Sequence, residues 1–139
     1  ARYKDFTLAQ TFIPNPRGGN TVATNDVSGN HMLRAPSWTF SISPTWETDL
    51  GSGRFGATAN LFHSSRVYQD FMNLFSQKPY TMLSGELSWT TGNGDWRFSV
   101  WGQNLLNKAV VQQMRVGNYS TDGIYEPPRR FGVGASRRF

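Results

Sequence analysis

The chain has no cysteine among its 139 residues, which excludes disulfide bonds, thiolate metal sites and a cysteine nucleophile. It also lacks any apolar run near the roughly 20 residues that a membrane-spanning helix needs. Its mean hydropathy is negative, at -0.51. No segment shows the period of about 3.6 residues that marks an amphipathic helix. These absences exclude helical folds but not membrane barrels, whose strands are polar on one side.

The chain has little acidic charge relative to basic charge. It has 14 Lys and Arg against 9 Asp and Glu, a net charge of +5 and a pI near 10.0. Proteins that bind nucleic acid concentrate such charge on one face. Here the basic residues are scattered, and only Arg129-Arg130 and Arg137-Arg138 are adjacent. We therefore expect solvated or lumen-facing charge and no nucleic-acid partner.

What the chain does have is alternation with a period of two. Between Trp38 and Glu47 every even position is apolar and every odd one is a small hydroxyl residue or a carboxylate, except that Pro44 removes a ladder donor. The pattern recurs after each turn signal and predicts an all-β antiparallel meander of about six or seven long strands. Pro44 should mark a bulge or bend. The expected strands are Trp38–Glu47, Phe55–Val67, Tyr80–Trp89, Trp96–Gln103, a weaker Ala109–Val116, Arg129–Phe139 and a possible fragment at Arg2–Leu8.

Two segments lack this alternation and are expected to be long connections, namely Gln10–Pro36 and Tyr68–Pro79. The amino terminus begins within a patterned stretch and has no leader-like sequence. We therefore expect the chain to be an internal cut of a longer protein.

The aromatic residues cluster near the ends of the expected strands. Trp38 and Trp46 lie eight steps apart, or about 26 Å along a strand, and a tilt near 40° reduces this to about 20 Å in height. That is close to the spacing of the two aromatic girdles of a membrane barrel. A β-sandwich, the main alternative, would draw its largest rings to mid-strand. The predicted girdle residues are Trp38, Trp46, Phe55, Trp89, Trp96 and Phe139.

Four short patterns occur in a characteristic order between Gly29 and Phe139. They are GNHMLRAPSW at 29–38, SRVYQD at 65–70, NLLNK at 104–108 and PRRFG at 128–132. Together they resemble the carboxy-terminal end of a TonB-dependent outer-membrane receptor. Such receptors end on an aromatic residue, as this chain does at Phe139, although Arg137 stands where Tyr is usual.

The resemblance implies that residues 1–139 are the carboxy-terminal portion of a barrel of about 22 strands. It implies a bacterial outer-membrane location and active uptake of a scarce ligand, such as siderophore-bound iron, a vitamin or an oligosaccharide. The implied partners are outer-membrane lipid, the rest of the barrel, a plug domain, the TonB energy-coupling protein through a part absent here, and the barrel-insertion machinery through Phe139.

Family topology also implies that the carboxy terminus faces the periplasm. Counting strands back from it puts the short turns at 48–53 and 91–95, with Gly117–Pro127, on the outside. The same count puts Gln10–Pro36, Tyr68–Pro79 and Leu105–Lys108 on the periplasmic side.

The polar face of the expected strands carries the candidate ligand contacts, which are Asn60, Arg66, Glu86, Arg97 and Gln103. The same residues could instead hydrate the barrel or contact the plug. Neither His31 nor His63 has a second histidine at ligand spacing, and no acid pair is identifiable, so we expect no catalytic, cofactor or metal residues and no enzyme.

Two other functions remain open from the residues alone. One is a soluble all-β module that stacks sugars or single-stranded nucleic acid on Trp89 and Trp101. The other is a segment of a passive porin, which has no plug.

Overall fold

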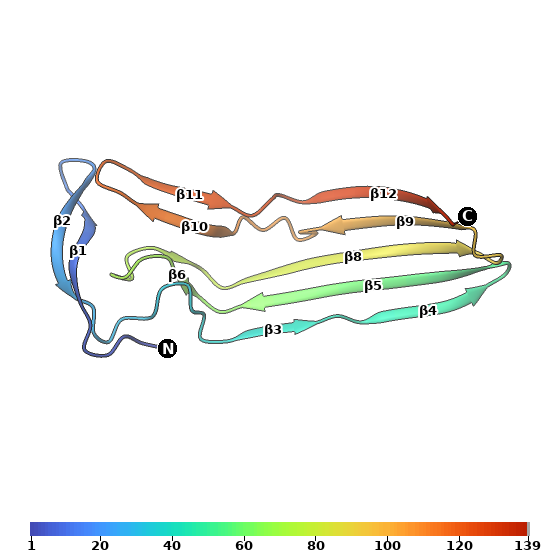
Figure 1. Ribbon diagram of the computed structural model, residues 1–139, viewed down its shortest axis with the longest axis horizontal. Helices are drawn as coiled ribbons and strands as arrows, with labels where there is room; N and C mark the ends of the chain where they lie inside the picture. Colours follow the sequence, from blue (N-terminus) through green and yellow to red (C-terminus); the bar gives the residue numbers. More distant parts are fainter. Residues whose placement is uncertain (139) are drawn as a thin grey trace. The chain divides into compact units, whose positions relative to one another are not determined.

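The computed structural model describes residues 1–138, apart from the side chain at position 9, and shows an antiparallel β-protein (Figure 1). None of these residues forms a helix long and apolar enough to cross a membrane. The strands are β1 (Thr7–Pro14), β2 (Asn20–Asp26), β3 (Thr39–Ile42), β4 (Thr45–Leu50), β5 (Gly53–Ser64), β6 (Val67–Tyr68), β7 (Ser76–Gln77), β8 (Tyr80–Thr91), β9 (Trp96–Gln103), β10 (Val111–Val116), β11 (Thr121–Tyr125) and β12 (Arg130–Arg137).

The chain divides into two compact units. Unit 1 comprises Ala1–Thr39, Ser64–Tyr80 and Ala109–Glu126. Unit 2 comprises Phe40–His63, Thr81–Lys108 and Pro127–Phe139, within which the structure describes residues up to 138.

Unit 2 is built on one open sheet with the strand order β12-β9-β8-β5-β3, and β4 also pairs with β5. Glycines in the left-handed region make its tight turns, with Gly51 between β4 and β5 and Gly94 between β8 and β9. The expected strands at 55–67, 80–89, 96–103 and 129–139 agree with β5, β8, β9 and β12 to within a few residues.

Pro44 divides the strand predicted at Trp38–Glu47, as expected. β3 ends at Ile42 and β4 begins at Thr45, so the pairing is interrupted for two residues. The Pro44 carbonyl still accepts a hydrogen bond of 3.0 Å from the Ala59 N–H. The proline therefore divides one long strand into two short ones, and both of them remain paired with β5.

Unit 1 contains three two-stranded sheets, β1-β2, β6-β7 and β10-β11. The prediction of a connection without strands at Gln10–Pro36 was wrong, because β1 and β2 pair there. In the predicted fragment Arg2–Leu8, Arg2 forms only an isolated bridge with His31. The hydrophobic core of the described residues, Val27 and Val110, belongs to this unit. The Asp70 carboxylate accepts hydrogen bonds from the Leu74 and Phe75 N–H groups and orders the turn before β7.

The strand predicted at Ala109–Val116 is present as β10, but it does not lie between β9 and β12 in the sheet of unit 2. β10 pairs with β11, which lies in the expected loop Gly117–Pro127, while β9 pairs directly with β12. The count from the sequence placed one strand between β9 and the carboxy-terminal strand, whereas the structure places none there.

That difference reverses the predicted placement of the turns. Arg137 of β12 pairs with Trp96, and the Arg138 N–H donates to the Asp95 carbonyl at 2.8 Å. The carboxy-terminal end of β12 and the β8–β9 turn thus lie at the same end of the sheet, where the sequence count had them at opposite ends.

Candidate functional site

The unit 2 sheet has one face made of apolar side chains in cross-strand rows. Leu87, Val100 and Val133 are paired across β8, β9 and β12, and Trp89, Phe98 and Ala135 form the next row. Phe55 and Trp46 extend this face onto β5 and β4. The sequence-predicted alternation of these strands is therefore confirmed.

These apolar side chains are exposed rather than packed. Val133 is 82% exposed, Val100 is 55% exposed and Trp46 is 58% exposed. Within the described part of unit 2, no hydrophobic side chain is buried. An apolar surface this continuous is expected only where it meets lipid or another protein.

Four of the six predicted girdle aromatics, Trp46, Phe55, Trp89 and Trp96, lie on this face. The rings of Trp46 and Phe55 meet edge to face with centroids 6.0 Å apart, and those of Trp96 and Phe98 stack at 5.9 Å. Trp89 covers Gly53, where an added Cβ would lie 2.5 Å from the indole ring. Trp38 belongs to unit 1 and Phe139 lies outside the described residues. The membrane-girdle role of these residues stays a prediction.

The opposite face of the same sheet is polar and internally bonded. The Glu86 carboxylate and the Arg97 guanidinium form an ion pair at 2.5 Å. The Arg130 guanidinium donates to the Gln103 side-chain oxygen at 2.6 Å, and the Asn60 amide donates to the Ser43 hydroxyl at 2.6 Å.

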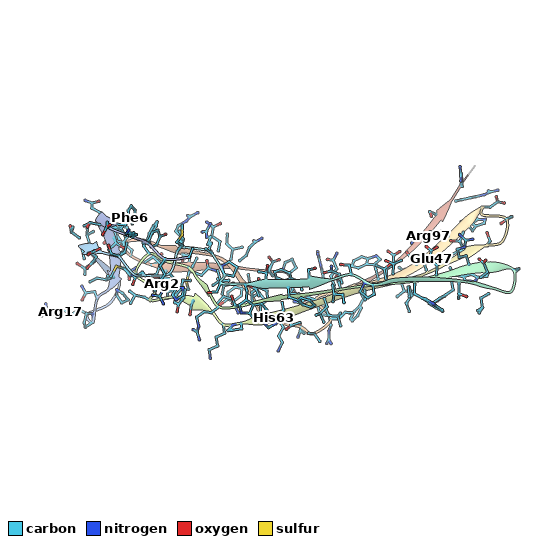
Figure 2. All side chains as sticks on the ribbon, turned by 90° about the horizontal axis from the view of Figure 1, so that it is seen from below. Arg2, Phe6, Arg17, Glu47, His63 and Arg97 are labelled. Atoms are coloured by element: carbon cyan, nitrogen blue, oxygen red, sulfur yellow. The ribbon has the colours of Figure 1, made fainter. Side chains whose placement is uncertain are left out.

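Glycines on this face are closely approached by neighbouring side chains. Gly56 and Gly134 lie against the hydroxyls of Ser88 and Ser99, where an added Cβ would come within 2.9 Å. Arg97 and Glu47, both labelled in Figure 2, belong to this face.

Three of the five predicted ligand contacts line one pocket of about 270 Å³ on the polar face. Asn60, Glu86 and Gln103 surround it with Ser84 and Trp101. Arg97 does not line the pocket, but it forms an ion pair with Glu86, which does. Arg66 is not part of this pocket, since it belongs to unit 1 and donates to the Ser76 hydroxyl at 2.9 Å. Ligand binding by any of these residues stays a prediction.

Trp101 is the pocket residue that the candidate list missed. It is a large ring on an otherwise polar face, and it lies over Gly132 of β12, where an added Cβ would come 2.3 Å from the indole ring. The signal available in the sequence was that one aromatic residue breaks the alternation of β9.

We expect Gly132→Ala to destabilise the protein by about 1–3 kcal/mol, because the methyl group must displace the Trp101 ring. Chemical denaturation of the refolded receptor measures this loss. Gly134→Ala is the matched control, since its methyl group meets only the Ser99 hydroxyl, which rotates away. Equal losses in the two variants would contradict the packing role of Trp101.

A polar turn follows β9, and its first side chain is hydrogen-bonded to the segment before β12. Asn104 is 5% exposed and adopts a left-handed conformation with φ of 49°. Its side-chain amide donates to the carbonyls of Lys108 and Pro127 at 2.9 and 3.0 Å, and its side-chain oxygen accepts from the Lys108 N–H. The first residue of the NLLNK pattern thus ties together two chain segments that are distant in sequence.

The described residues contain no group of three or more His, Cys, Asp or Glu side chains that could hold a metal ion. The His31 ring stacks on Tyr68 with centroids 4.8 Å apart, and His63 shares a hydrogen bond of 2.8 Å with the Thr81 hydroxyl. Both histidines thus have local structural contacts.

Comparison with known proteins identifies the family of this two-faced sheet. The family model for the β-barrel of TonB-dependent receptor-like proteins matches residues 2–105. A search of curated protein sequences finds no match to the chain.

Two solved structures share the fold. The ferric yersiniabactin uptake receptor FyuA from Yersinia pestis matches 84% of the chain with a TM-score of 0.72 at 19% identity. BauA, the ferric preacinetobactin receptor from Acinetobacter baumannii, matches 91% with a TM-score of 0.63 at 17% identity. The chain spans 19% and 20% of the lengths of these two receptors.

The predicted fold class is confirmed, with antiparallel strands in a sheet that does not close within this chain. Proteins of the matched family are transport receptors of the bacterial outer membrane and not enzymes. By this match, the chain belongs to the family of TonB-dependent receptor β-barrels.

Proposed function

We propose that the chain forms part of the barrel wall of an outer-membrane receptor for active uptake of a scarce ligand. The observation that carries this proposal is the two-faced sheet of unit 2, which exposes apolar rows on one side and bonded polar groups on the other. A soluble module would have to bury those rows, whereas a barrel wall places them in lipid and its polar face in the lumen.

The sheet supplies only part of such a wall. β3 and β12 are its edge strands, and the pairing on their outer sides must come from other strands in a closed barrel. We infer that residues 1–139 are the carboxy-terminal portion of a barrel of about 22 strands. The plug domain, the TonB protein and the insertion machinery follow as proposed partners.

The orientation follows from the shared end of β12 and the β8–β9 turn. If the carboxy terminus faces the periplasm, the turns at 50–53 and 92–95 face it too. The long segments at 64–80 and 109–126, which join the other ends of the strands, then lie outside the cell. This arrangement agrees with the short periplasmic turns and long extracellular loops of membrane barrels.

The favoured ligand is a ferric chelate. Both structural neighbours are receptors for ferric chelates, and no observation on this chain favours a vitamin or an oligosaccharide over them. The polar pocket around Asn60, Glu86 and Gln103 supplies hydrogen-bonding groups on the lumen side. The same groups could contact the plug instead of the ligand.

Uptake of radioactive iron tests this function. Deletion of the gene should abolish uptake of one ferric chelate from a panel by iron-starved cells, and a protonophore should abolish it in the wild type, because this transport depends on energy coupling. Uptake that survives the protonophore would indicate a passive porin. Recovery of the protein from the cytosol without detergent would support the soluble module.

A further inference from the structure

A second pocket, of about 350 Å³, lies entirely within unit 1. Its walls come from β1, from β10 and from two turn segments at 33–34 and 69–71, which are far apart in the chain. It shares no lining residue with the polar pocket of unit 2. Its volume is in the lower part of the range of small-molecule sites, so we expect a small ligand.

Part of the pocket lining is apolar. The Phe71 ring is fixed there by two further rings, since its centroid lies 5.9 Å from that of Tyr3 and 6.5 Å from that of Phe6. The apolar lining residues are all half-buried and are Phe12, Leu33, Phe71, Met114 and Val116. A flat apolar ring is the kind of group that such a lining accommodates.

Two arginines of the same pocket have no anionic partner within residues 1–138. Neither the Arg34 nor the Arg115 side chain takes part in an ion pair or a side-chain hydrogen bond there. Both oxygens of Asp70, the one acidic residue of the lining, already accept backbone N–H groups of the following turn. Asp122 is the cross-strand partner of Arg115, but its carboxylate accepts from a serine hydroxyl instead. Two guanidinium groups are therefore available to an anion.

A buried glutamine of the lining is only half satisfied. Gln69 is 5% exposed, and its side-chain amide donates to the Val111 carbonyl at 3.3 Å. Its side-chain oxygen is buried and accepts no hydrogen bond from the described part of the chain. Because a buried acceptor without a donor is unfavourable, a ligand hydroxyl group that reached this oxygen would gain affinity.

We propose that this pocket binds an aromatic carboxylate that also carries a hydroxyl group. The carboxylate accepts from Arg34 and Arg115, whose planar guanidinium groups match its geometry. The ring lies against Phe12 and Phe71, and the hydroxyl group donates to the Gln69 oxygen. The inference goes beyond the proposed function, because binding here does not require that the ligand be transported.

Titration of the complete receptor in detergent with 6-hydroxy-2-naphthoate, followed by the fluorescence of this probe, tests the proposal. We expect saturable binding that Arg34→Gln and Arg115→Gln each weaken by about tenfold, the usual effect of losing a hydrogen bond to a charged group. 2-Naphthoate, which lacks the hydroxyl group, should bind about fivefold more weakly. The uncharged 6-hydroxy-2-naphthamide should bind more weakly than the acid and equally to the wild type and both variants.

Arg17→Gln is the matched control. It removes an arginine of the same unit that is exposed in the β1–β2 turn, labelled in Figure 2, and that does not line the pocket. Its affinity for the probe should equal that of the wild type. If Arg34→Gln does not fold, Arg115→Gln on β10 decides the outcome together with the amide probe.

Four results would overturn the proposal. They are no saturable binding to the wild type, equal losses in Arg17→Gln and Arg115→Gln, equal affinity for the acid and the amide, and 2-naphthoate binding as tightly as the hydroxylated acid. Iron uptake by cells is scored separately. Absence of uptake contradicts the proposed function, whereas normal uptake by a receptor that does not bind the probe contradicts only the aromatic-acid site.

Discussion

Val100→Arg should destabilise the receptor by about 2–4 kcal/mol, the cost of placing an arginine near the middle of the lipid-facing surface of a barrel. Val100 is the central member of the row that joins Leu87 and Val133, and it lies near the middle of β9. An arginine there has no short route to a headgroup. The measurement is a reversible denaturant titration of the receptor in lipid vesicles.

The neighbouring position supplies the control for this experiment. Ser99→Arg introduces the same group one residue earlier in β9, on the polar face beside Ser88 and Gly134. If that face lines a water-filled lumen, its cost should stay well below that of Val100→Arg. Similar losses at positions 99 and 100 would argue that the two faces have similar surroundings, as in a soluble sheet.

Asn104→Ala should cost about 2–4 kcal/mol, which makes it the second large effect. Three hydrogen bonds are lost, and the carbonyls of Lys108 and Pro127 and the Lys108 N–H are left without this partner in a partly buried turn. Alanine is also less tolerant than asparagine of the left-handed conformation at this position. The loss should appear in equilibrium unfolding and as a lower yield of folded receptor.

Asn107→Ala separates the two causes. Asn107 has a nearly identical φ of 50°, but it is exposed and accepts a single bond of 3.3 Å from the Arg129 N–H. Both variants therefore carry the conformational cost, and only Asn104→Ala removes a buried side chain that makes three hydrogen bonds. We expect a loss of about 1 kcal/mol for Asn107→Ala. If the two losses were the same, the network around Asn104 would not stabilise the turn.

Three of the candidate ligand contacts line one pocket, while ligand binding by them stays a prediction, and the reason for the partial grouping is physical. Alternation assigns a residue to a face, so Asn60, Glu86 and Gln103 were correctly placed together on the polar one. It does not say which residues lie opposite each other across strands, because register depends on turns and on partner choice. Arg66 was included because its position continues the polar series of β5, yet β5 ends at Ser64.

The two errors in the fold have different causes. β10 alternates much as a wall strand would, but it pairs with β11. The β1-β2 hairpin was missed because its alternation is weak, although the Gly18-Gly19 pair, in which both residues have positive φ, was a turn signal.

By itself, the sequence determined that the chain consists of two-faced strands, and it determined which residues of β5, β8, β9 and β12 share a face. Those properties depend only on the period of two along one strand. The tertiary structure decided that β9 pairs with β12 and that the β8–β9 turn lies beside the end of β12. These are relations between residues far apart in the chain, and a local pattern carries no information about them.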